Sequence, residues 1–163
     1  MIRKAQEQDL EKIFPIYEAA RKYMAENGNP TQWKDHWPPK ELLQEDVQKG
    51  NLYVYEVDGE IHGVFAFILG EDPTYKVIRD GQWLNDEPYG TMHRVAGDGK
   101  VKGVFKECID FCKSQSKNVR IDTHPNNSTM LHLIEKNGFT RCGTIVLADD
   151  TDRIAFQYVG SDQ

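Results

Sequence analysis

The stretch Gly97-Asp98-Gly99-Lys100-Val101-Lys102-Gly103 lies between residues 89–96, which are typical of a β-strand, and residues 103–115, which are typical of a helix with one apolar face. Glycines let several backbone N–H groups turn towards one point, and the N-terminus of the following helix adds partial positive charge. Such a loop can hold a phosphate or pyrophosphate. It matches neither GxxxxGK[ST] nor GxGxxG, and an ordinary strand-to-helix turn explains it equally well.

A second strand and helix follow this unit. Residues 118–123 predict the strand, and Asn127 is a favoured N-cap for a helix that ends at Gly138. Residues 139–147 and 153–158 predict two final strands. Two strand-to-helix crossovers in this half of the chain indicate helices packed on the faces of a sheet.

The first half of the chain predicts two helices and a hairpin. Apolar residues at three- and four-residue steps predict a helix over 9–26, and a shorter one over 39–49 ends at Gly50. An aromatic-rich loop over 31–40 separates them. Residues 52–57 and 61–69 predict strands joined by the tight turn Asp58-Gly59. The order β, α, α, β, β, β, α, β, α, β, β predicts a mixed sheet in one domain over 1–163.

Composition excludes several classes of protein. With 163 residues, 39 % hydrophobic and 28 % charged, the chain is globular rather than disordered. No apolar run approaches the roughly 18 residues of a membrane span, and no signal peptide precedes the first helix, so we expect a cytoplasmic protein. A net charge of −6 argues against binding nucleic acid or an anionic membrane, and favours a cationic small molecule. The three cysteines lack zinc spacing, so we expect buried thiols and no metal.

Five separated segments occur in an order known from one family: Asn27-Gly28-Asn29-Pro30-Thr31-Gln32-Trp33, Asp72-Pro73-Thr74-Tyr75, His93-Arg94-Val95-Ala96, Arg120-Ile121-Asp122-Thr123-His124 and Asn137-Gly138-Phe139. With them, almost the whole chain resembles the GNAT superfamily of acyl-CoA-dependent N-acetyltransferases, and more narrowly a bacterial subgroup of undefined substrate. The resemblance implies an α/β (α+β) fold: a mixed, mostly antiparallel central sheet of about seven strands, flanked by about four helices and splayed between strands 4 and 5.

The resemblance also implies an acetyl-CoA site without metal. The pyrophosphate loop of the family, Gln/Arg-x-x-Gly-x-Gly/Ala, falls on residues 100–105, where Lys100 and Phe105 depart from the usual residues. The end of the fourth strand would hold the pantetheine arm, and Asn127 would touch the cofactor or serve only as an N-cap. The implied cofactor-binding residues are Val95, Ala96, Gly97, Lys100, Val101, Lys102, Gly103, Val104, Phe105 and Asn127.

Acetylation of an amine needs a base, because a primary amine with a pKa near 10.4 is protonated at pH 7. The family often has a glutamate where Thr91 stands and an acidic tyrosine where Ile134 stands, and neither residue can replace them. His93, two residues after Thr91 on the same face of the strand, is the candidate base, since an unperturbed imidazole titrates near pH 6.5. Asp122 and His124 are alternative bases or an orienting pair. A backbone N–H near Val95 would meet the oxyanion.

Aromatic residues are candidates for the acceptor pocket. Trp33, Trp37, Tyr75 and Trp83 would form a wall that attracts ammonium groups, or would simply cover the open end of the sheet. Arg94 and Arg120 are expected to form structural salt bridges, and His132 to lie on the surface.

The predicted activity is N-acetyl transfer from acetyl-CoA to the primary amine of a small, cationic acceptor, by direct attack in a ternary complex. The alternatives are a CoA-binding module with little catalysis, and an acetyltransferase of protein N-termini or lysines. We expect a monomer or a homodimer.

Overall fold

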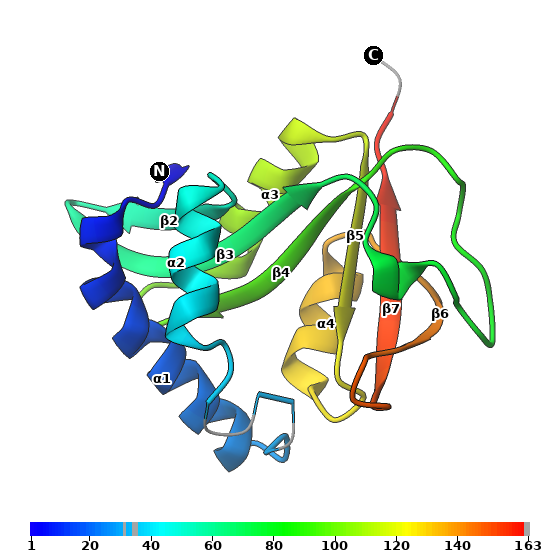
Figure 1. The fold of residues 1–163 in the computed structure, drawn as a ribbon, viewed down its shortest axis with the longest axis horizontal. Helices are drawn as coiled ribbons and strands as arrows, with labels where there is room; N and C mark the ends of the chain where they lie inside the picture. The colour runs from blue at the N-terminus through cyan, green and yellow to red at the C-terminus, as the bar shows by residue number, and fades with distance from the viewer. Residues whose placement is uncertain (31, 34–35, 162–163) are drawn as a thin grey trace.

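A computed structural model of the chain describes residues 1–30, 32–33 and 36–161. Its seven strands form one sheet in the order β1-β2-β3-β4-β5-β7-β6, in which β4 and β5 are parallel and all other neighbours antiparallel (Figure 1). The strands are β1 (Ile2–Lys4), β2 (Leu52–Val57), β3 (Glu60–Leu69), β4 (Gly90–Gly97), β5 (Asn118–Thr123), β6 (Thr140–Val146) and β7 (Asp152–Val159). The helices are α1 (Leu10–Glu26), α2 (Lys40–Gln48), α3 (Val104–Gln115) and α4 (Ser128–Lys136), with short 3-10 turns η1 (Glu7–Asp9) and η2 (Pro73–Tyr75).

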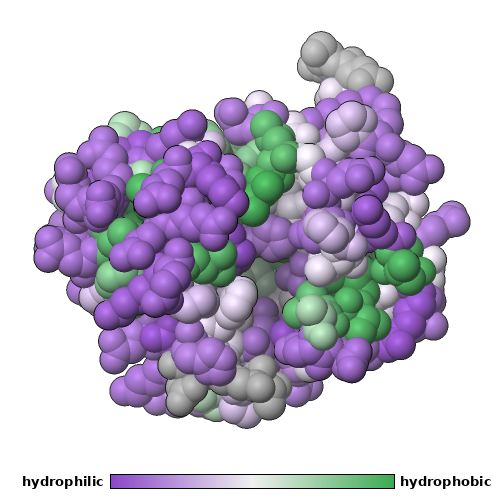
Figure 2. All heavy atoms as spheres, in the orientation of Figure 1, coloured by the Kyte–Doolittle hydropathy of each residue, from purple (hydrophilic) through white to green (hydrophobic). Residues whose placement is uncertain are grey.

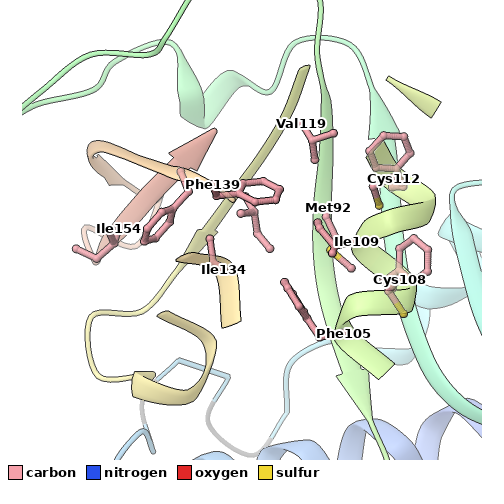
Figure 3. Close-up of a cluster of buried hydrophobic side chains, with 13 residues drawn as sticks. Met92, Phe105, Cys108, Ile109, Cys112, Val119, Ile134, Phe139 and Ile154 are labelled. Carbon is pink, nitrogen blue, oxygen red and sulfur yellow. The ribbon is translucent and has the colours of Figure 1, made fainter. Parts of the chain in front are cut away.

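The helices cover the two faces of the sheet in pairs. Apolar side chains of α1 and α2 pack on alternate residues of β2 and β3, such as Leu52 and Val54. The opposite face of the sheet packs against α3 and α4 in a second core that includes Met92 and Ile134 (Figure 3). Figure 1 shows α1 and α2 in front of the sheet.

The sheet opens between β4 and β5. These strands pair only at Gly90–Val119 and Thr91–Arg120, although β4 continues to Gly97 and β5 to Thr123. The two strands then diverge, and α4 lies at the gap (Figure 1). In the same view the surface is mostly hydrophilic and is hollowed near its middle, where this gap opens (Figure 2).

The predicted elements are confirmed with small shifts at their ends. The first helix begins at Leu10 because residues 7–9 form a 3-10 turn, and the hairpin turn places both Asp58 and Gly59 at positive φ. Asn127 caps α4 by accepting a hydrogen bond from Met130 N at 3.1 Å. The three cysteines are buried, and no described helix is long and apolar enough to cross a membrane. In the expected loop over 31–40, Thr31, Lys34 and Asp35 lie outside the described residues.

Candidate active site

Two cavities meet at the gap between β4 and β5. The first, here called the groove, has a volume of about 420 Å³ and lies between α1, the end of β4, the following loop, and the starts of α3 and α4. The second, here called the pocket, has a volume of about 430 Å³ and reaches towards β7. Both cavities are lined by Met24, Val95, Asn127 and Met130. An elongated ligand in the groove can therefore present one end to the pocket.

The groove collects seven of the ten predicted cofactor residues: Val95, Ala96, Gly97, Val101, Val104, Phe105 and Asn127. Lys100 lines a neighbouring hollow, and Lys102 and Gly103 line neither cavity. Gly103 instead precedes α3 at a φ of 75°, a conformation that suits glycine. The carboxylate of Asp98 accepts a hydrogen bond from Lys100 N at 2.9 Å, so one backbone N–H of this loop is already bonded to a side chain of the same loop.

A bulge in β4 shapes the junction of the two cavities. Arg94 has a φ of 56°. His93 and Ala96 are three residues apart along β4, whereas their partners in β3 are only two residues apart, so β4 contains one extra residue here. Two buried residues from other elements hold this strained backbone. The Tyr17 hydroxyl donates to the Arg94 carbonyl at 2.6 Å, and the Arg94 guanidinium donates to both carboxylate oxygens of Asp46 at 3.0 and 3.1 Å. The predicted salt bridge of Arg94 is thus confirmed.

His93 lines the pocket and lies beside a carboxylate. Its Nε2 is 3.1 Å from Asp72 Oδ2, while the backbone and hydroxyl of Thr74 donate to Asp72 Oδ1 at 2.9 and 2.6 Å. Burial alone would raise the pKa of Asp72, but the hydrogen bonds from His93 and Thr74 outweigh burial and lower that pKa to about 2. Asp72 is therefore ionised at neutral pH and can orient the imidazole.

Asp122 lines the pocket as well, whereas His124 does not. Tyr75 donates its hydroxyl proton to Asp122 Oδ2 at 2.5 Å, and burial raises the pKa of this carboxyl. His124 accepts a hydrogen bond from Asn126 N at its Nδ1, 3.0 Å away, and burial lowers its pKa. The structure thus brings His93 and Asp122 together and leaves His124 outside the pocket lining.

The four predicted aromatic residues separate into two pairs. Trp33, which is buried against Tyr17, and the exposed Trp37 line the pocket. Tyr75 and Trp83 do not line it. They pack against each other beside η2, with ring centroids 5.0 Å apart, and cover the sheet.

Arg120 joins this second aromatic cluster. Its guanidinium lies 4.0 and 3.9 Å from the ring centroids of Trp83 and Tyr89. Among the described residues no carboxylate pairs with Arg120, so the predicted salt bridge is wrong, and cation–π contacts stabilise the charge instead.

Thr91 and Ile134 supply no acid or base. Thr91 is buried, and its Oγ1 has no hydrogen-bond partner within the described part of the chain. Ile134 is fully buried in the core between α4 and the sheet (Figure 3). His132 is two residues before Ile134, which places it on the opposite face of α4, and it is exposed, as predicted.

The pocket also contains charged residues that the sequence analysis did not assign: Asp72, Asp149 and Arg153. Asp72 could have been found from its local pattern, because Asp followed by Pro and Thr is typical of a turn closed by the aspartate side chain. Arg153 had no comparable local signal, because burial does not alternate along β7: residues 153–157 are all buried.

Comparisons with known proteins agree with this geometry. No protein-family model matches the chain, and no curated protein matches it. Among solved structures, a GNAT-family acetyltransferase from Streptococcus agalactiae is 30 % identical, with a TM-score of 0.89 over 99 % of this chain and 96 % of that one. A proposed acetyltransferase from Staphylococcus aureus is 25 % identical (TM-score 0.70, 98 % of each chain). A GNAT-family acetyltransferase from Listeria monocytogenes is 19 % identical (TM-score 0.71, 98 % and 94 %), which indicates a shared fold.

Proposed function

Because the chain belongs to the GNAT family of acetyltransferases, we propose that it transfers an acetyl group from acetyl-CoA to the primary amine of a small, cationic acceptor by direct attack in a ternary complex. The observation that carries this proposal is the unpaired edge of β4 beyond Thr91, which separates the groove from the pocket. Acetyl transfer requires a donor and an acceptor that approach one point from different sides, and the two cavities provide this arrangement.

The groove fits the donor. The β4 edge over 92–97 has no partner in β5, so its backbone groups can bond the amides of a pantetheine arm as an added strand would. The apolar side chains of Val101, Val104 and Phe105 suit the arm's methylene groups. The exposed Lys102 lies just before α3, where a cation favours a pyrophosphate. Bound acetyl-CoA would supply an activated thioester at the junction of the two cavities.

The pocket fits an amine. Its lining includes three carboxylates, from Asp72, Asp122 and Asp149, which favour an ammonium group. His93 accepts one proton from the bound ammonium group, so that the nitrogen lone pair can attack the acetyl carbon. The carbon–sulfur bond then breaks, and the acylated nitrogen loses its second proton to water. The thiolate takes a proton from water, because Ile134 cannot donate one. Asp122 is the alternative base.

Val95 is proposed to stabilise the developing oxyanion through its backbone N–H. It follows the bulge at Arg94 and lines both cavities, so its peptide group lies where donor and acceptor meet. Fixed backbone donors act without reorganisation, so geometry contributes more to the rate than acid catalysis does.

Thermal unfolding with acetyl-CoA tests the donor site. Acetyl-CoA at 100 times its dissociation constant stabilises a protein by about 2.7 kcal/mol, which for this chain length raises Tm by roughly 5–10 °C. ADP, which carries the pyrophosphate without the pantetheine arm, is the control and is expected to raise Tm much less. An equal shift with both compounds would contradict binding along the β4 edge, and no shift at millimolar acetyl-CoA would contradict the donor site itself.

A further inference from the structure

Strand register places a positive charge opposite Asp122 in the pocket. Asp122 of β5 pairs with Ala155 of β7, and residues paired across antiparallel strands project from the same face. Arg153 lies two residues before Ala155 and therefore shares this face. Both Asp122 and Arg153 line the pocket, and Asp122 is the carboxylate with the largest electrostatic effect on the Arg153 guanidinium.

The Arg153 guanidinium is buried and forms no ion pair with the residues that the structure describes. The residue is 5 % exposed, yet its contacts are with neutral oxygens: Nη1 donates to Thr151 Oγ1 at 3.1 Å and to the Asp152 carbonyl at 2.9 Å, and Nη2 donates to the Gln32 carbonyl at 3.5 Å. No carboxylate of the described residues lies within 4.0 Å of it, and no hydrogen bond of Nε to them is present.

Arg94, which also lines the pocket, differs from Arg153 in having a paired guanidinium. It donates through two nitrogens to both oxygens of Asp46. A buried charge is costly unless it is paired, so Arg153 has an unmet requirement that Arg94 does not have. Because Arg153 lines the pocket, the pairing group can be part of the acceptor.

We propose that Arg153 binds a carboxylate of the acceptor, so that the acceptor is a small amino acid-like molecule with a primary amine and a carboxylate. This inference rests on the proposed acetyl transfer and refines its acceptor. The planar guanidinium matches the two oxygens of a carboxylate, while Asp72, Asp122 and Asp149 meet the ammonium group. A phosphate dianion is disfavoured relative to a carboxylate, because it would bring twice the negative charge towards the three carboxylates of the same pocket.

The test compares matched acceptors. A panel of amino acids is assayed for acetylation beside their carboxamides and their decarboxylated amines, with the wild-type chain, Arg153→Gln, Arg153→Lys and the control Arg141→Gln. Arg141 is exposed on β6 and lines neither cavity. The amine of a carboxamide is less basic than that of the free amino acid, so more of it is neutral and reactive at pH 7. If the enzyme nevertheless prefers the free amino acid, the preference must come from binding of its carboxylate.

We expect the wild type to use the carboxylates with kcat/KM at least about tenfold above that of the amides, mainly through KM. Arg153→Gln should abolish this preference, Arg153→Lys should keep part of it, Arg141→Gln all of it, and none should change the KM for acetyl-CoA. Equal use of carboxylates and amides by the wild type would overturn the inference and leave acetyl transfer intact. Acetylation of no compound would overturn both. If Arg153→Gln fails to fold, the wild-type and Arg153→Lys comparisons decide.

Discussion

His93→Gln is expected to lower kcat by about 10²–10⁴-fold at neutral pH, because glutamine cannot accept the proton that leaves the amine. Glutamine has a similar length and can still donate to Asp72, so the local structure should persist. His93 lines the pocket and not the groove, so affinity for acetyl-CoA should be unchanged. Steady-state kinetics with saturating acetyl-CoA, together with a direct binding measurement, separate the two effects.

The matched control for this prediction is His132→Gln, on the exposed face of α4, which should leave kcat unaltered. If His93→Gln retained wild-type kcat, His93 would have no role as a base, and Asp122 would become the remaining candidate in the pocket lining.

Asp46→Asn is expected to lower the free energy of unfolding by about 3 kcal/mol, because it removes the buried counter-charge of the partly buried Arg94 guanidinium. Burial raises the pKa of Asp46, although Arg94 opposes this, so the ion pair itself adds little net stability. Removing one partner is nevertheless costly. The loss should be at the low end for a buried pair, since the asparagine oxygen still accepts one hydrogen bond. Denaturant unfolding measures it, and a loosened bulge should also lower kcat.

Glu45→Gln provides the control for the Asp46 variant. Glu45 is the neighbouring residue on α2 and pairs with Lys49 on the exposed surface, where solvent screens the charges. Its substitution should scarcely change unfolding. A similarly small effect of Asp46→Asn would show that the Arg94 bulge does not depend on this ion pair.

Local signals in the sequence predicted most of the fold. The Asp58-Gly59 turn, the Asn127 cap and the apolar face of α1 each depend on residues close together in the chain, so they can be predicted without tertiary contacts. The family resemblance implied that residues 95–97 hold a pantetheine arm, and the structure has these residues along the groove.

The charged groups of the pocket could not be predicted in the same way, because their partners are distant in the chain. Asp72 meets His93 from a loop, and Asp46 reaches the Arg94 bulge from α2. Arg153 enters the pocket only through the register of β5 and β7. Lys100 is the opposite case. The loop pattern predicted that Lys100 lies at the cofactor site, but in the folded loop it lines a different hollow.

The most direct test of acetyl transfer incubates the protein with acetyl-CoA and a panel of primary amines, and measures the free thiol of CoA and the mass of each amine. We expect thiol to be released in an amount equal to that of the acetylated amine, and no release when either substrate is omitted. Binding of acetyl-CoA without acetylation of any amine would contradict it and leave a CoA-binding module. Acetylation of peptides alone would instead place the acceptor among protein N-termini or lysines.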